Sequence, residues 1–148
     1  MKVKNDILKP LFDLDGTLIK EVRGSKRLFD FTNPAVILNL EESDLTPLGV
    51  LVRDSGKAFD ILTARGDLSA PFIRLALSML GFNVRNVFTV GVDISQPADW
   101  AKVSSKNIVA KKQALVRELT RKLVDNDPRN LEGLGELGEL VSETQTQF

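Results

Sequence analysis

The sequence contains no cysteine and no histidine among its 148 residues. Without cysteine the chain can form no disulfide, no thiolate nucleophile and no cysteine-ligated zinc site. Without histidine it lacks Ser-His hydrolase chemistry, imidazole metal ligands and a histidine proton shuttle. An enzyme made of this chain must therefore work with carboxylates, lysines, hydroxyls and backbone groups. Carboxylate nucleophiles assisted by a metal ion meet that restriction.

Long apolar runs are also missing from the sequence. No stretch of about 18 apolar residues is present, so we expect no membrane span. Residues 1–10 carry charge but no long apolar region, which is not typical of a secretory signal, and we expect a cytoplasmic protein. The length, with 43% hydrophobic and 27% charged residues, is typical of one globular domain. We expect a core over about residues 9–138 and a C-terminal tail over residues 139–148.

The formal net charge is zero, but the charges are unevenly distributed. Residues 102–129 contain eight basic and three acidic side chains, whereas the last nineteen residues contain four glutamates and no base. A solvated helix face is one interpretation of the basic region. A surface for a phosphate-rich partner such as nucleic acid is the other.

The most informative stretch is Lys9–Lys20, with the sequence KPLFDLDGTLIK. Its short apolar run between Pro10 and Gly16 predicts a buried strand that ends in a turn. Asp13 and Asp15 are two residues apart, so side-chain alternation places both carboxylates on one side of the strand end. An acidic turn is the simplest interpretation, because Asp and Gly are common turn residues. Unpaired carboxylates beside an apolar strand are costly, however, and a bound divalent cation such as Mg²⁺ would offset that cost.

The rest of the sequence alternates between strand and helix patterns. Strands are expected at residues 57–63, 84–90 and 122–124, with a final edge strand at 139–144. Helices are expected after Thr46-Pro47, from Ser69 to Gly81, from Ser104 or Ser105 onward, and over 130–137, whereas 35–40 fits either a helix or a strand. Residues 20–31, around Gly24-Ser25, are expected to form a small β-hairpin flap. Such alternation predicts an α/β domain with a mostly parallel sheet and helices on both faces.

The string FDLDGTL, residues 12–18, resembles the first motif of the haloacid dehalogenase-like (HAD) superfamily of phosphohydrolases. The resemblance implies a three-layer Rossmann-like sandwich. It also implies that Asp13 is the nucleophile, which forms an aspartyl-phosphate, and that Asp15 is the general acid and base. A carboxylate suits the first role because it is ionised at neutral pH and needs no base to prepare it.

The string ILTARG, residues 61–66, is similar to the family's second motif. There a Thr or Ser at the end of the second strand hydrogen-bonds the phosphoryl group, which implies that role for Thr63. Ala64 and Arg65 follow in the exit loop and are the next expected substrate contacts. Thr is also an ordinary strand residue, so the match depends on its place after an apolar strand.

The string LVDNDPRN, residues 123–130, resembles the family's final acidic motif, in which a strand ends in two adjacent acids. By that template Asp125 orients a lysine or a metal-bound water. Asn126 stands where most members have the second acid, although its carbonyl oxygen is still a ligand that Mg²⁺ accepts. Asp127 is the alternative. The resemblance thus implies Mg²⁺ as cofactor, held by Asp13, Asp15, Asp125 and Asn126.

The family also uses a lysine, near the start of the helix before the final motif, that neutralises the phosphate and the attacking carboxylate. Lys106 lies nineteen residues before Asp125. That distance accommodates a helix of about eleven residues and a strand of about five. Lys112 lies only thirteen residues before Asp125. We therefore favour Lys106 as the catalytic lysine, with Lys112 second and Lys111 third.

The spacing of the motifs leaves no room for the cap domain that many members use to select small substrates. The gaps are forty-eight residues from Asp15 to Thr63 and forty-three from Thr63 to Lys106, and both must also contain core elements. An uncapped site would be open, so we expect a large phosphorylated substrate, a protein partner or a second copy of the chain to cover it.

Together these patterns predict a Mg²⁺-dependent phosphomonoester hydrolase. A nucleotide or polynucleotide end is the first substrate class to consider, because of the basic region. Phosphotransfer through the same intermediate stays open beside hydrolysis. The alternative is a non-catalytic HAD-like scaffold or assembly protein, for example a phage particle component, because a fold does not guarantee a function.

Overall fold

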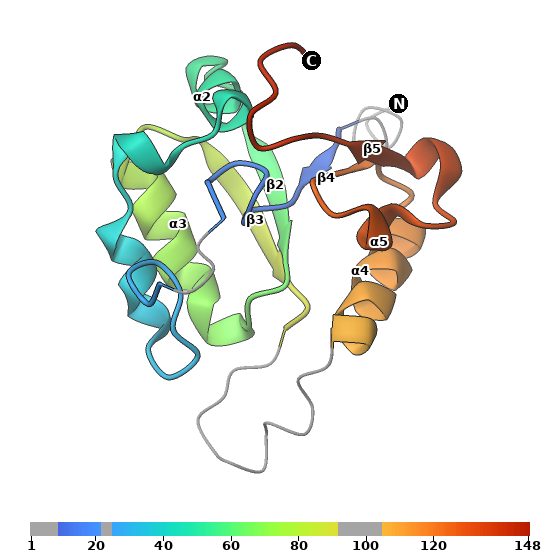
Figure 1. Cartoon of the computed structure of the whole chain (residues 1–148), viewed down its shortest axis with the longest axis horizontal. Helices are drawn as coiled ribbons and strands as arrows, with labels where there is room; N and C mark the ends of the chain where they lie inside the picture. Colours follow the sequence, from blue (N-terminus) through green and yellow to red (C-terminus); the bar gives the residue numbers. More distant parts are fainter. Residues whose placement is uncertain (1–8, 22–24, 92–104) are drawn as a thin grey trace.

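The computed structural model describes residues 9–21, 25–91 and 105–148, and in those ranges it combines five strands with four α-helices (Figure 1). The strands are β1 (Leu11–Phe12), β2 (Phe59–Thr63), β3 (Val84–Thr89), β4 (Leu123–Asp125) and β5 (Gly138–Leu140). The α-helices are α2 (Pro47–Asp54), α3 (Ala70–Met79), α4 (Ser105–Leu119) and α5 (Pro128–Leu131). Short 3₁₀ helices cover Pro34–Asn39, Glu42–Asp44, Asp67–Ser69 and Gly135–Leu137. None of the described helices has the length and apolar character needed to cross a membrane.

All five strands are parallel, in the order β3-β2-β1-β4-β5. The α/β class and the parallel sheet predicted from the sequence are therefore confirmed. The chain builds outward from β1 to β3 and then returns to place β4 on the other side of β1. Ligands in open α/β sheets bind at the carboxyl ends of the strands where the order reverses in this way, which here is between β1 and β4.

Neighbouring residues of one strand belong to different hydrophobic clusters. Ile61 packs in a larger cluster with Leu77 of α3, whereas Leu62 packs in a smaller one with Val116 of α4. Figure 1 shows α3 and α4 on opposite sides of the strands. Because successive side chains of a strand point to opposite faces, β2 is buried on both sides, and all five of its residues are buried.

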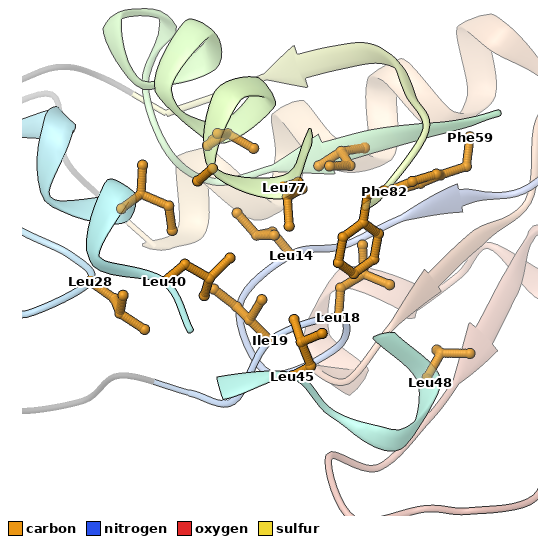
Figure 2. Packing of buried hydrophobic residues seen from close by; sticks show 14 of the residues in the cluster. Leu14, Leu18, Ile19, Leu28, Leu40, Leu45, Leu48, Phe59, Leu77 and Phe82 are labelled. Atoms are coloured by element: carbon orange, nitrogen blue, oxygen red, sulfur yellow. The ribbon is translucent and has the colours of Figure 1, made fainter. Parts of the chain in front are cut away.

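The turn after β1 is part of the larger cluster. Leu14, Leu18 and Ile19 are fully buried, and Figure 2 shows them packed among residues that come from several other segments. The backbone N–H groups of Leu18 and Ile19 both donate to the Leu14 carbonyl, at 3.0 and 3.1 Å. Gly16 makes the turn possible at φ +83°, and a Cβ there would lie 2.4 Å from the side-chain nitrogen of Asn126. The core thus fixes this turn tightly against the loop after β4.

The hairpin expected at residues 20–31 is not seen in the described part of that segment. Residues 25–31 contain turns and no strand, and Gly24 lies outside the described residues. The segment is instead held by side chains, because Leu28 is buried in the larger cluster and Arg27 pairs with Asp44. Side-chain anchoring therefore replaces cross-strand pairing.

The single helix expected over residues 130–137 is also wrong. α5 ends at Leu131, and only the short 3₁₀ helix Gly135–Leu137 follows. Gly133 and Gly135 adopt φ values of +77° and +57°, which end a right-handed helix. The segment 35–40, left open between helix and strand, is the 3₁₀ helix Pro34–Asn39, and Asn33 caps its start. The final strand is Gly138–Leu140, at the edge of the sheet.

A buried ion cluster ties the strands together away from their carboxyl ends. Asp60 of β2 is fully buried and accepts hydrogen bonds from Arg85 at 2.6 and 3.0 Å, and Arg121 lies 2.7 Å away. Arg121 also donates to the carbonyls of Lys9 and Pro10, just before β1. Burial alone would raise the pKa of Asp60, but its hydrogen bonds to Arg85 and Arg121 outweigh burial and lower it.

Asp60→Asn is expected to lower the unfolding free energy by about 3 kcal/mol, because it leaves the buried guanidinium of Arg121 without its carboxylate. That corresponds to a fall in Tm of roughly 10 °C for a chain of this size. Thermal unfolding at pH 7 checks it, with Asp54→Asn, an exposed carboxylate, as the matched control that leaves Tm unchanged.

The same cluster predicts a pH dependence. Because the pKa of Asp60 is lower in the folded than in the unfolded chain, its stabilisation is present above the unfolded value of about 4 and is lost as the pH falls through the folded value. The Tm difference between wild type and Asp60→Asn should shrink below about pH 4. A constant difference across that range would contradict this account.

Candidate active site

The carboxyl ends of three adjacent strands meet at one edge of the sheet. Asp13 follows β1, Thr63 ends β2 and Asp125 ends β4. The backbone N–H of Asp13 donates to the Val124 carbonyl at 2.9 Å, which holds the β1 end beside β4. Three of the residues predicted from the sequence are therefore delivered to the topological switch point by the strands themselves.

Lys112 of α4 lies at the centre of this site. Its ammonium donates to Asp13 Oδ1 at 2.6 Å and to Asp125 Oδ2 at 3.0 Å, and its side chain is only 1% exposed. Burial alone would lower the pKa of Lys112, but attraction to Asp13 and Asp125 and the two hydrogen bonds outweigh burial and raise it. The side chain is therefore a buried cation between two carboxylates.

This geometry selects the second of the three candidate lysines. The side chain of Lys106 lies outside the described residues, and Lys111 is exposed. Lys112 lies one helical turn before Val116, which is fully buried in the smaller cluster. A lysine on the buried face of an amphipathic helix is the signal that could have identified Lys112, because residues four apart share one face.

Asp13 is held on both of its carboxylate oxygens. Besides Lys112 on Oδ1, Thr17 donates its hydroxyl to Oδ2 at 2.9 Å. Burial, the largest cause, raises the pKa of Asp13 to about 7; Asp125 and Asp15 add to the rise and Lys112 opposes it. Thr17 was part of the first motif but received no role from the sequence.

Both carboxylate oxygens of Asp125 accept hydrogen bonds. Its Oδ2 accepts from Asn130 at 2.9 Å as well as from Lys112, and its Oδ1 accepts the backbone N–H of Asp127 at 2.9 Å. Its side chain is fully buried. Asp125 therefore contacts both Lys112 and Asn130, and Asn130 is a residue of the site that sequence reasoning missed.

Asp127, the alternative metal ligand, is engaged elsewhere. Its carboxylate accepts the backbone N–H of Arg129 at 2.9 Å and so caps α5. It also pairs with the Arg129 guanidinium at 2.7 Å. The Arg129 hydrogen bond, with burial opposing it, lowers the pKa of Asp127. The side chain of Asp127 thus serves the turn into α5.

The amide of Asn126 faces a cluster of oxygens. Its inward atom lies 3.0 Å from Asp13 Oδ2 and 3.1 Å from the backbone oxygen of Asp15. It also lies 3.3 Å from both Asp125 Oδ1 and Thr17 Oγ1. With nitrogen inward the amide donates to these acceptors, and with oxygen inward a cation is needed to separate the oxygens.

These oxygens fit a magnesium ion. Neighbouring ligands of an octahedral Mg²⁺ at about 2.0–2.1 Å lie about 2.9 Å apart, close to the separations of the Asn126 amide from Asp13 and from Asp15. In the part of the chain that the structure describes, no group of three or more Asp, Glu, His or Cys side chains is arranged to hold a metal. A cation here would therefore use one carboxylate, of Asp13, with neutral oxygens from Asp15 and Asn126.

The side chain of Asp15 points to a different partner. Its two oxygens accept from Nη2 and Nε of Arg65, at 2.7 and 3.0 Å, so the strand end separates the two carboxylates instead of pairing them. Arg65, expected at the phosphate, thus contacts Asp15. Thr63 is fully buried and its Oγ1 accepts the backbone N–H of Arg65 at 3.1 Å, whereas Ala64 beside it is exposed.

An open groove borders the site at Asn126 and runs past Pro128 to Leu140 and Val141. Glu21 and Glu143 also line it, and its described lining contains no lysine or arginine. Two bases of the basic region, Lys112 and Arg121, are buried in ion pairs, and two more are paired with carboxylates at the surface, namely Lys122 with Glu139 and Arg129 with Asp127.

Comparisons of the chain with protein-family models, with curated proteins and with solved structures each found no match.

Proposed function

We propose that the protein is a Mg²⁺-dependent phosphomonoester hydrolase with a HAD-like, three-layer Rossmann-like sandwich fold. The observation that carries the proposal is the buried ammonium of Lys112 between Asp13 and Asp125 at the switch point of the sheet. A buried ion cluster does not by itself indicate a stabilising role. The free-energy cost of removing its charges from water offsets most of the attraction between them. Phosphoryl transfer, in contrast, needs a fixed positive charge beside a carboxylate nucleophile.

The chain's own residues divide the reaction among them. The Asp13 carboxylate attacks phosphorus, the bond to the leaving oxygen breaks, and an aspartyl-phosphate forms. Asp15 gives that oxygen a proton and later accepts one from the water that hydrolyses the intermediate and restores Asp13. Lys112 compensates the negative charge of Asp13 and of the phosphoryl oxygens, and Thr63 donates its hydroxyl to one of those oxygens.

Bound Mg²⁺ supplies positive charge that reduces the repulsion between a phosphate dianion and the nucleophile. Asp13 Oδ2, the backbone oxygen of Asp15 and the amide oxygen of Asn126 are the atoms that would hold it. Asp125 would support the site through Lys112 and would not touch the metal.

The surroundings of the site bear on the substrate. A polynucleotide strand lying in the groove would meet Glu21 and Glu143, and four of the basic side chains that suggested nucleic acid are already paired with carboxylates, two of them buried. These two observations favour a phosphomonoester with a short leaving group, such as a nucleotide, over a polynucleotide end. Competition by single-stranded DNA that weakens steeply with salt would contradict this preference.

The test of function is phosphate release from p-nitrophenyl phosphate, with and without Mg²⁺. We expect Mg²⁺-dependent turnover in wild type and a loss of at least about a thousandfold in Asp13→Asn, because the amide cannot act as the nucleophile. Asp54→Asn, an exposed carboxylate, is the matched control and should keep full activity. Mass spectrometry of the acid-quenched wild type should find the phosphoryl group on Asp13.

The alternative of a non-catalytic scaffold predicts the opposite result. Wild type would then release no phosphate with any divalent cation, and Asp13→Asn would lower only the unfolding free energy, because it takes a carboxylate from the buried Lys112. Turnover that survives in Asp13→Asn would reject the nucleophile assignment instead.

A further inference from the structure

Arg65 donates two hydrogen bonds to the carboxylate of Asp15. Nη2 donates to Oδ1 at 2.7 Å and Nε donates to Oδ2 at 3.0 Å, a bidentate arrangement that fixes the plane of the carboxylate as well as its position. The Asp15 side chain is 30% exposed, whereas that of Arg65 is 3% exposed. The carboxylate therefore lies at the open side of the site while the guanidinium behind it is buried.

Arg65 is itself held from the opposite side. Its Nη1 donates to the carbonyl of Leu28 at 2.7 Å, and its guanidinium lies 5.0 Å from the centre of the Phe29 ring. Leu28 is anchored in the larger hydrophobic cluster. The guanidinium is thus fixed between the carboxylate and the segment 25–31, and all three of its nitrogens already donate to the protein.

We propose that Arg65 is a positioning residue for Asp15 and not a contact to the phosphate. This inference rests on the proposed hydrolase function, in which Asp15 protonates the leaving oxygen. The two guanidinium hydrogen bonds use one lone pair on each oxygen of Asp15, so the second lone pair of each oxygen stays available on the open side of the site. The bidentate contact therefore keeps the carboxyl aimed at the leaving oxygen without blocking it.

This role has a consequence that a phosphate contact or a structural arginine would not share. Asp15 matters most for a poor leaving group, because an alkoxide needs a proton to depart and an acidic phenol does not. Loss of Arg65 should therefore slow alkyl phosphates much more than activated aryl phosphates. A phosphate contact would instead weaken both substrates equally, through KM.

The experiment compares benzyl phosphate with p-nitrophenyl phosphate, two uncharged leaving groups of similar size, in Arg65→Gln, Arg65→Lys, Asp15→Asn and the double variant Arg65→Gln/Asp15→Asn. General acid catalysis contributes about 10²–10⁴-fold. We expect Arg65→Gln to lower the single-turnover rate of phosphoryl transfer, which excludes the later hydrolysis of the aspartyl-phosphate, about a hundredfold on benzyl phosphate and less than about tenfold on p-nitrophenyl phosphate, with the half-saturating substrate concentration nearly unchanged. The double variant should match Asp15→Asn alone, because Arg65 acts only through Asp15.

Arg65→Lys keeps the charge but offers a single point contact, so it should recover part of the loss on benzyl phosphate. If thermal unfolding shows that Arg65→Gln does not fold, Arg65→Lys takes its place in the comparison of the two substrates. Arg74→Gln is the matched control, since the exposed Arg74 donates only to the carbonyls of Val84 and Arg85 among its described contacts.

Several results would overturn the proposal. Equal losses of the single-turnover phosphoryl-transfer rate on both substrates would make Arg65 structural, and an equal rise in the half-saturating concentration on both would make it a phosphate contact. Additive effects in the double variant would show that Arg65 acts independently of Asp15. No hydrolysis of either substrate by wild type would reject the proposed function, and this inference with it.

Discussion

Lys112→Met is expected to lower turnover of p-nitrophenyl phosphate by about a thousandfold and to lower the unfolding free energy by about 3–5 kcal/mol. Methionine fills a similar volume but leaves Asp13 and Asp125 buried without the cation that both of them contact, at 2.6 and 3.0 Å. A single removed partner is costly because the remaining charges stay desolvated. Steady-state kinetics and thermal unfolding measure the two effects on the same sample.

Two neighbouring variants serve as matched controls. Lys111→Met changes an exposed lysine on the same helix, so it should alter neither turnover nor Tm. Lys106→Met tests the lysine that the spacing of the motifs favoured. If Lys106→Met loses activity while Lys112→Met keeps it, the assignment of Lys112 is wrong and the spacing argument is right.

The strands could be predicted because each one carries its own local signal. Phe59–Thr63 and Val84–Thr89 are rich in β-branched and aromatic residues and follow Gly56 and Gly81, and the structure ends both within a residue of the expected position. Thr46 likewise caps α2 by accepting the backbone N–H of Gly49, as the Thr-Pro pattern indicated. Such signals depend on a few adjacent residues, so one sequence is enough to read them.

The partners of charged residues could not be predicted in the same way. Asp15 and Arg65 are fifty residues apart, and Lys112 is ninety-nine residues from Asp13. Their pairing depends on the strand order and on which face of α4 turns inward. The family resemblance implied a lysine near the start of the helix, and counting a helix and a strand joined end to end then favoured Lys106. In the structure the middle of α4 passes the strand ends.

The backbone conformation and surroundings of two glycines could not be predicted from the sequence either. The sequence predicted one helix over residues 130–137, but α5 ends at Leu131 and Gly133 adopts a φ of +77°. Gly16 was recognised as a turn residue, yet its closeness to Asn126 could not be foreseen, because it depends on the approach of the loop after β4. Both cases need tertiary contacts that no local pattern contains.

Asn126→Asp is expected to make the stability of the protein depend much more strongly on Mg²⁺. The inward atom of residue 126 lies 3.0 Å from Asp13 Oδ2 and 3.3 Å from Asp125 Oδ1. A carboxylate there would be a third acidic group beside Asp13 and Asp125, which already share the contact with Lys112. In EDTA we therefore expect a lower Tm than wild type, since like charges in a buried site repel.

Added Mg²⁺ should reverse the loss, because a carboxylate is a stronger ligand than an amide for a hard cation. If the substitution tightens Mg²⁺ binding about a hundredfold, linkage adds up to about 2.7 kcal/mol at saturation. The Tm shift between EDTA and saturating Mg²⁺ should then exceed that of wild type by roughly 5–10 °C. Thermal unfolding of both proteins in the two buffers measures this without any substrate.

Two further variants identify which side chain is responsible. Asn126→Leu should abolish the Mg²⁺-dependent shift, whereas Asp127→Asn should leave it intact and lose only a little stability through the weakened cap of α5. The reverse pattern would assign the ligand to Asp127. Asn126 thus has a physical rationale: Asp15 is paired with Arg65, and Asp13 and Asp125 already share the single cation Lys112. A third carboxylate in this cluster would make the metal-free fold less stable, so the amide gives up Mg²⁺ affinity in exchange for stability without the metal.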